Sequence, residues 1–218
     1  MTMKKLILIV FGVVLPIFIH AQTKPQALVF VGFAGRSEVE GIYQYGAGVK
    51  IPLKYGFALQ PEIFYDKHYT EFYTIINTWS SVKVAAPFLE FPVQVQWGKD
   101  FGGIRPYLFV SPFVGFGLGS VKGTFSITEN KVDRIEYEAT SFKDSGIKPF
   151  ILGGGVGIGI EAAKHFQLSV QYNSSAYDFI DYHVRNEVVR QFWSDFKETK
   201  GRGRKFFEDF YFQVALLF

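Results

Sequence analysis

The last ten residues, Asp209–Phe218, read DFYFQVALLF and give the strongest indication of the fold. Large apolar side chains occupy every second position of this stretch: Phe210, Phe212, Val214, Leu216 and Phe218. Alternate residues of a strand point to opposite faces, so this spacing makes one face of a strand wholly apolar. A strand that faces lipid in a membrane β-barrel needs such a face. The segment therefore predicts a membrane-spanning strand.

The start of the chain predicts export. Lys4 and Lys5 precede an apolar run, Leu6–Ile19, and the residues His20–Gln22 offer a cleavage site. We expect residues 1–21 to be a cleaved signal peptide of the Sec pathway and residues 22–218 to form the mature barrel domain. A retained helical anchor is the alternative, but the run is shorter than the ~20 apolar residues that span a membrane and contains Pro16.

Composition narrows the class of protein. The net charge of +3 includes Lys4 and Lys5, so the mature chain is close to charge balance and no nucleic-acid partner is predicted. The chain has no Cys, which leaves neither a disulfide framework nor a lipid-modified cysteine. Aromatic residues make up 18% of the chain and glycine occurs 22 times. Aromatics suit a lipid-facing surface and glycine suits a crowded barrel interior.

A period of two recurs along the mature chain and predicts about eight strands of the ~9–11 residues that a tilted membrane strand needs. The alternation is clearest in Tyr43–Leu53 and in the segments that start at Phe57, Leu89, Phe150 and Phe166. Two further segments, Ala27–Gly35 and Tyr107–Gly119, are apolar at both parities, so their lipid-facing side stays open.

The polar residues and the connections between strands indicate which face of each strand points into the hydrated interior and which faces lipid. A soluble lipocalin-like barrel also alternates, but its outer face would carry many Lys and Glu, whereas the polar parity here is mostly Gly, Gln, Ser and Asn. The connections are predicted to be short at Lys54–Gly56, Gly98–Gly103 and Ala163–His165 and long at Lys67–Ser81, Val121–Lys148 and Ser174–Phe207. Short periplasmic turns alternating with long extracellular loops are typical of bacterial outer-membrane barrels.

A few charges fall on the inward parity and predict a polar plug: Lys50, Glu62, Glu90 and Glu161. Arg105 is expected near the periplasmic rim. Eight strands enclose a space that side chains fill, and buried charges persist there when they are paired. We therefore expect structural ion pairs and no open channel. The alternative is a pair of carboxylates that performs acid/base chemistry.

Two histidines are candidate catalytic groups. His68 lies beside Asp66 and Glu71 where a strand meets a long loop, and His183 lies near Asp178 and Asp181. Neither pattern matches a trusted nucleophile or metal motif. We predict no catalytic, cofactor-binding or metal-binding residues and no enzyme activity.

The last long loop contains an amphipathic segment followed by basic residues. A surface that contacts anionic lipopolysaccharide or a partner protein is predicted at Phe192, Trp193, Phe196, Arg202, Arg204 and Lys205. The alternative is a loop that only caps the barrel.

Several segments resemble the PorT-like outer-membrane β-barrel family of the Bacteroidetes. They are the leader ending at Ala21-Gln22, FLEFPVQVQW at Phe88–Trp97, RPYLFVSP at Arg105–Pro112 and GGGVGIGIE at Gly153–Glu161. The final alternating residues Phe210, Phe212, Val214, Leu216 and Phe218 also resemble the C-terminal signal for barrel assembly. The resemblance implies an integral outer-membrane protein, and some family members are tied to protein secretion or gliding.

Together, these observations predict an all-β protein: an eight-stranded antiparallel up-and-down transmembrane barrel in the cell outer membrane. Its expected role is that of a non-enzymatic scaffold or binding protein, associated with secretion or envelope assembly. The expected partners are outer-membrane lipid and lipopolysaccharide, the barrel-assembly machinery and an envelope or secretion protein, with no cofactor. A lipid-modifying barrel enzyme and a small pore remain the alternatives.

Overall fold

The computed structural model describes residues 24–34, 42–76, 78–129, 133–176, 180–181, 184, 186–198, 202–203 and 208–218. The expected signal peptide lies outside these residues. The elements are β1 (Gln26–Ala34), β2 (Ile42–Pro52), η1 (Lys54–Gly56), β3 (Phe57–Ile76), β4 (Thr78–Gly98), β5 (Ile104–Gly117), β6 (Lys122–Glu129), β7 (Asp133–Ala139), α2 (Phe142–Ser145), β8 (Phe150–Ala162), β9 (Phe166–Ser175), α3 (Glu187–Glu198), β10 (Arg202–Gly203) and β11 (Glu208–Leu217). Within the described part of the chain, no helix is both long and apolar enough to cross a membrane.

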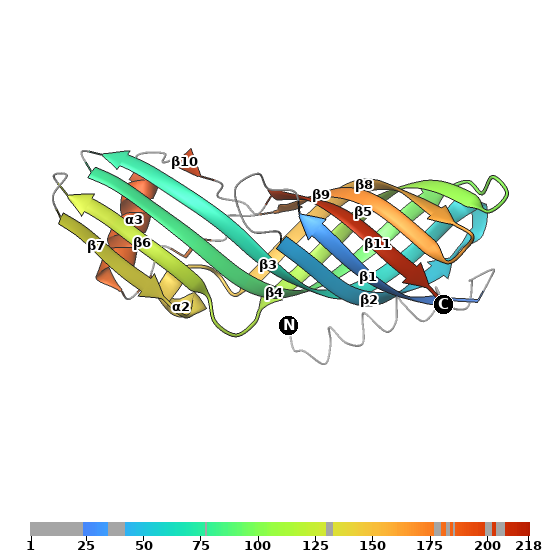
Figure 1. Cartoon of the computed structure of the whole chain (residues 1–218), viewed down its shortest axis with the longest axis horizontal. Coiled ribbons are helices and arrows are strands. Elements are labelled where there is room, and N and C mark those ends of the chain that lie inside the picture. The colour runs from blue at the N-terminus through green and yellow to red at the C-terminus, as the bar shows by residue number, and fades with distance from the viewer. Residues whose placement is uncertain are drawn as a thin grey trace.

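Eight of the described strands close into an antiparallel barrel in the order β1-β2-β3-β4-β5-β8-β9-β11. The pairing of β11 with β1, from Leu28 opposite Leu217 to Ala34 opposite Tyr211, completes the ring. Figure 1 shows this barrel with the C-terminus at its end. The predicted eight-stranded up-and-down barrel is confirmed.

The predicted short turns are found together at the end of the barrel that carries Phe218. The backbone amide of Phe218 bonds to Ala27 and that of Leu217 bonds to His165, which ties the last strand to this rim. The three connections are η1, residues 99–103 and residues 163–165.

At the opposite end, β3 and β4 continue far beyond the barrel (Figure 1). The outer part of β4 pairs with β6, β6 pairs with β7, and β10 pairs with the outer part of β3. The prediction of loops at Lys67–Ser81 and Val121–Lys148 is therefore wrong for most of their length. A strand was expected to stop at membrane length, but the β-forming residues of these segments keep pairing outside the barrel. We call β10, β6, β7, α2, α3 and the outer parts of β3 and β4 the extension.

The extension has its own apolar core. Its buried residues come from the ends of the barrel, the extra hairpin and the helix: Val84, Ala86, Phe88, Phe113, Val121, Phe125, Ala139, Ile147, Ile151, Ile180, Val184, Val189, Phe192 and Trp193. Phe192 and Trp193 are completely buried, and the indole N–H of Trp193 donates to the carbonyl of Ser145 at 3.1 Å. Their prediction as an exposed interaction surface is wrong, because the apolar face of α3 is covered by the extension sheet.

The outer wall of the barrel carries two belts of aromatic residues. The exposed aromatics near the extension are Phe33, Tyr43, Tyr45, Phe91, Phe116, Phe150, Phe210 and Phe212, and those near the short turns are Tyr55, Phe57, Trp97, Phe101, Phe166 and Phe218. Exposed aliphatic residues lie between the belts, among them Val31, Val93, Val110, Val156, Ile158 and Val170. Aromatic girdles on either side of an apolar band mark the two membrane interfaces of an outer-membrane barrel.

The interior combines polar residues with aromatic ones. The two strands whose parity was open place Leu28 and Phe30 of β1, and Tyr107, Phe109 and Phe113 of β5, inside. The three β5 rings lie over glycines of the neighbouring strand β8, where an added Cβ would come within 2.3–2.4 Å of a ring atom. The prediction of an interior made mainly of small polar residues is therefore incomplete, because aromatic rings fill the space that the glycines leave.

Candidate functional site

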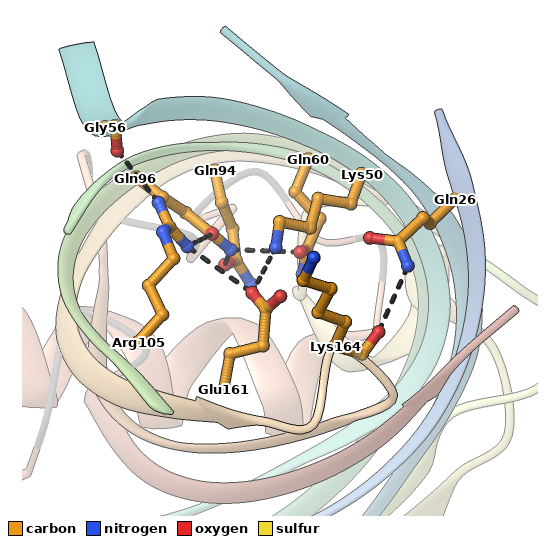
Figure 2. Close-up of polar contacts among 9 residues, drawn as sticks. All are labelled: Gln26, Lys50, Gly56, Gln60, Gln94, Gln96, Arg105, Glu161 and Lys164. Atoms are coloured by element: carbon orange, nitrogen blue, oxygen red, sulfur yellow. Dashed lines mark hydrogen bonds and ion pairs between the residues drawn. The ribbon is translucent and has the colours of Figure 1, made fainter. Parts of the chain in front are cut away.

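The first polar network lies inside the barrel near the short turns, and Figure 2 shows it. Lys50 of β2 and Glu161 of β8 form a buried ion pair across the lumen. Arg105 of β5 lies 3.5 Å from the same carboxylate and donates to the Gly56 carbonyl at 2.9 Å and to Gln96 at 3.1 Å. Opposite charges are thus paired, as a low-dielectric interior requires.

Glutamines extend this network toward the middle of the barrel. Glu62 accepts hydrogen bonds from Gln60 at 2.6 Å and from Gln94 at 3.0 Å. Gln96 donates to Gln60 at 2.9 Å and to Gln94 at 3.1 Å. The side chains project from the neighbouring strands β3 and β4, and they fix one another in place.

A second network occupies the other end of the lumen, under the extension. His68 Nε2 lies 2.5 Å from Glu90 Oε1 and 3.7 Å from Asp66 Oδ2. Asp66 also accepts from the Tyr211 hydroxyl at 2.7 Å and from Gln44 Nε2 at 3.0 Å. All five side chains are buried. We call Asp66, His68 and Glu90 the histidine-carboxylate cluster.

The four residues of the predicted plug all lie inside, but they divide between different partners. Lys50 and Glu161 pair with each other, Glu62 joins the glutamines, and Glu90 contacts His68 at the far end. Sequence reasoning placed His68 at the start of a loop, and the structure places it in the lumen. The sequence does contain a pattern that predicts this position. Glu62, Asp66 and His68 all have even numbers in one uninterrupted strand, so their side chains point to the same face, the lumen.

Only some of the other residues singled out in the sequence lie in the described part of the chain. The backbone of Arg202 pairs with Tyr73 at the edge of β3. The side chain of Phe196 and the residues Arg204, Lys205, Asp178 and His183 lie outside the described part of the chain. The side chains Phe210, Phe212, Leu216 and Phe218 lie on the exposed outer wall, and Val214 of the same parity is half-buried.

Comparison with known proteins agrees with this architecture. A family model described as outer membrane protein beta-barrel domain matches residues 33–181, more than half of the chain. The chain belongs to this outer-membrane β-barrel family. No curated protein matches the chain.

Two solved barrels are similar to this outer-membrane barrel protein. The N-terminal β-barrel domain of Pseudomonas aeruginosa OprF has 10% sequence identity and a TM-score of 0.36, over 89% of this chain and 100% of that one. Neisserial surface protein A, NspA, has 10% identity and a TM-score of 0.37, over 89% of this chain and 96% of that one.

Membership in the family gives the outer-membrane barrel an orientation. Short turns of such barrels face the periplasm and longer connections face the outside. The ion pair of Lys50 and Glu161 therefore lies at the periplasmic end. The histidine-carboxylate cluster lies at the outer end, and the extension stands outside the cell.

Proposed function

We propose that this protein is a non-enzymatic scaffold of the outer membrane whose extension binds another protein of the cell envelope. The observation that carries the proposal is the extension itself, a sheet with a packed helix that two strands of the barrel wall hold outside the membrane. A structure with its own core presents a defined surface, whereas unstructured loops would not. The resemblance to the PorT-like family supports the finer proposal of a role in secretion or envelope assembly.

The lumen argues against a pore. The side chains that point into it include the ion pair of Lys50 and Glu161, the glutamines and the rings of Phe109 and Phe113, all of them buried. An eight-stranded barrel has just enough room for such side chains. We therefore expect purified protein in planar bilayers to show no conductance steps. Regular conductance steps would support the alternative of a small pore.

The burial of His68 argues against this residue as the catalytic group of a lipid-modifying enzyme. The His68 side chain lies inside the barrel and the residue is only 4% exposed. The ring of Phe88 packs against its imidazole, with 5.4 Å between the ring centroids. A lipid substrate in the outer leaflet would approach the outer wall of the barrel. The proposal predicts an unchanged lipid A mass profile in a deletion strain, and a changed profile would favour the enzyme.

The binding role is tested by photo-crosslinking in living cells. A crosslinking amino acid is placed at Ser194, on the exposed side of α3, or at Glu138, at the exposed end of β7. Ile158, which is 60% exposed on the lipid-facing wall, is the matched control. We expect one discrete protein adduct from the extension sites and none from the control.

Two results would contradict the proposal. If Ser194 and Glu138 give the same adducts as Ile158, the extension has no partner of its own. If they give only adducts with lipid, the extension is not a protein-binding surface. For the finer proposal, a deletion strain should lose specific proteins from its surface or medium, and an unchanged set would remove a secretion role.

A further inference from the structure

We propose that the histidine-carboxylate cluster, Asp66, His68 and Glu90, is a binding site for a divalent transition-metal ion. The cluster brings one imidazole nitrogen and two carboxylate oxygens to within 4.8 Å of one another inside the barrel. All three side chains are at least nine-tenths buried. The strands β3 and β4 hold them, since Asp66 and His68 share one face of β3 and Glu90 faces them from β4.

The separations suit a single ion. Zinc binds histidine nitrogen and carboxylate oxygen at about 2.0–2.2 Å in tetrahedral geometry, which places neighbouring ligands roughly 3.3–3.6 Å apart. The cluster shows 2.5 Å from His68 Nε2 to Glu90 Oε1 and 3.7 Å from His68 Nε2 to Asp66 Oδ2. Side-chain adjustments of about 1 Å or less therefore bring both distances to a coordinating value, and the third distance, between the two carboxylate oxygens, is no more than 4.8 Å.

Neighbouring groups orient the ligands as they do in metal sites. The Tyr211 hydroxyl and Gln44 Nε2 donate to Asp66 Oδ2, and the backbone amide of Lys67 donates to Asp66 Oδ1 at 2.6 Å. Phe88 packs its ring against the ring of His68. Such outer groups fix ligand orientation, and their loss typically weakens metal binding ~10–100-fold.

Gln44 gives an independent indication of a ligand. Its side chain is 1% exposed and its amide faces Asp66, yet its oxygen Oε1 has no hydrogen-bond partner among the described residues. Buried polar atoms are rarely left without a partner. Rotation of the amide about its last bond would exchange Nε2 and Oε1. Oε1 would then replace the hydrogen bond to Asp66 and offer the ion a third oxygen, which would be its fourth ligand.

Charge and ligand type indicate which metal would bind. Two carboxylate ligands match the charge of a divalent cation. One nitrogen with two oxygens suits Zn²⁺ or Mn²⁺, whereas Ca²⁺ prefers oxygen alone. Of these two, Zn²⁺ should bind more tightly.

The position of the cluster gives the metal a structural role. It lies where β3 and β4 leave the barrel, and Asp66 is also bonded to Gln44 of β2 and Tyr211 of β11. A bound ion would join these strands at the base of the extension. Because metal binding adds to the free energy of folding, the ion would stabilise the outer rim.

The test uses the full mature chain, refolded in detergent and treated with a chelator. Zn²⁺ alone is added in equilibrium dialysis, and bound metal is counted by mass spectrometry. We expect one Zn²⁺ per chain, weaker binding of Mn²⁺, and an upward shift of the thermal midpoint with Zn²⁺. His68→Gln and Glu90→Gln should abolish stoichiometric binding, and Tyr211→Phe should weaken it ~10–100-fold.

Two variants are matched controls. His165→Gln removes a histidine at the opposite end of the barrel, and Glu62→Gln removes a buried carboxylate outside the cluster. Both should still bind one Zn²⁺, and a heat-dependent shift in gel mobility shows that each variant is folded. The proposal is overturned if the folded parent protein binds no stoichiometric Zn²⁺, or if the folded His68→Gln and Glu90→Gln variants bind as well as the controls.

Discussion

The buried pair of Lys50 and Glu161 offers a quantitative test of how the lumen is held together. The two side chains are only 4% and 7% exposed. Removing one member of such a pair leaves an uncompensated charge, which typically costs about 3–5 kcal/mol. The two single substitutions should not cost the same, because Arg105 lies 3.5 Å from Glu161.

Glu161→Gln should cost the full amount of about 3–5 kcal/mol, because it leaves the ammonium of Lys50 without its carboxylate. Lys50→Met should cost less, about 2 kcal/mol, since Glu161 keeps Arg105 as a cationic neighbour and loses one charged hydrogen bond. The double variant removes both charges of the pair, so it should be more stable than Glu161→Gln alone. The expected coupling energy is therefore at least about 2 kcal/mol.

Urea unfolding in detergent micelles measures these differences. The folded fraction is followed by gel mobility of unheated samples, and the free energy of unfolding is extrapolated to zero urea. The reasoning is refuted if the double variant loses as much stability as the sum of the two single variants. It is also refuted if Lys50→Met costs more than Glu161→Gln.

Three further predictions concern packing and assembly. Gly157→Ala should destabilise the barrel by about 1–3 kcal/mol in the same assay, because the new Cβ would lie 2.4 Å from the Phe109 ring and 2.5 Å from a backbone carbonyl oxygen. Gly154→Ala is the control: its new Cβ would have no atom within 4 Å, so its stability should be unchanged. Trp193→Ala should lower the stability of the extension by about 3–5 kcal/mol, because it leaves a cavity in the extension core. Limited proteolysis should then cut the extension and leave a heat-modifiable barrel. Equal digestion of the extension and the barrel would contradict a separate extension core. Deleting Phe218, which is 69% exposed, should lower the amount of barrel in cell membranes but cost refolded protein only about 1 kcal/mol, the usual contribution of the hydrogen bond from its backbone amide to Ala27. A larger drop in that stability would point to a packing role of its side chain.

The segments that start at Phe57, Leu89 and Phe166 could be predicted well because their two faces differ sharply. Charged and amide side chains alternate with large apolar ones, so a single strand reveals which face meets lipid. The strand of Tyr107 and Phe109 could not be assigned in this way. Its rings face inward because glycines stand opposite them on β8, and that register is invisible in the strand itself.

The outer end of the molecule was predicted less well for a different reason. His68 was placed at a strand boundary because membrane strands are short, and this limit does not apply to a strand that continues into water. The amphipathic pattern of α3 was recognised, but its pattern does not say what covers the apolar face. The structure shows that the cover is the extension sheet, which buries Phe192 and Trp193.

The ribbon of β3 and β4 keeps one register from Phe57 opposite Trp97 to Ile76 opposite Thr78. At about 3.3 Å per residue, its 20-residue strand β3 is roughly 66 Å long, well over twice the ~25 Å apolar band of the membrane. A load along these strands is shared by the ladder hydrogen bonds on either side of Glu62 and Ile63, and the register does not shift between the two stretches. The ribbon therefore connects its outer tip directly to the barrel wall, and force applied at the tip would act on the wall strands along their length.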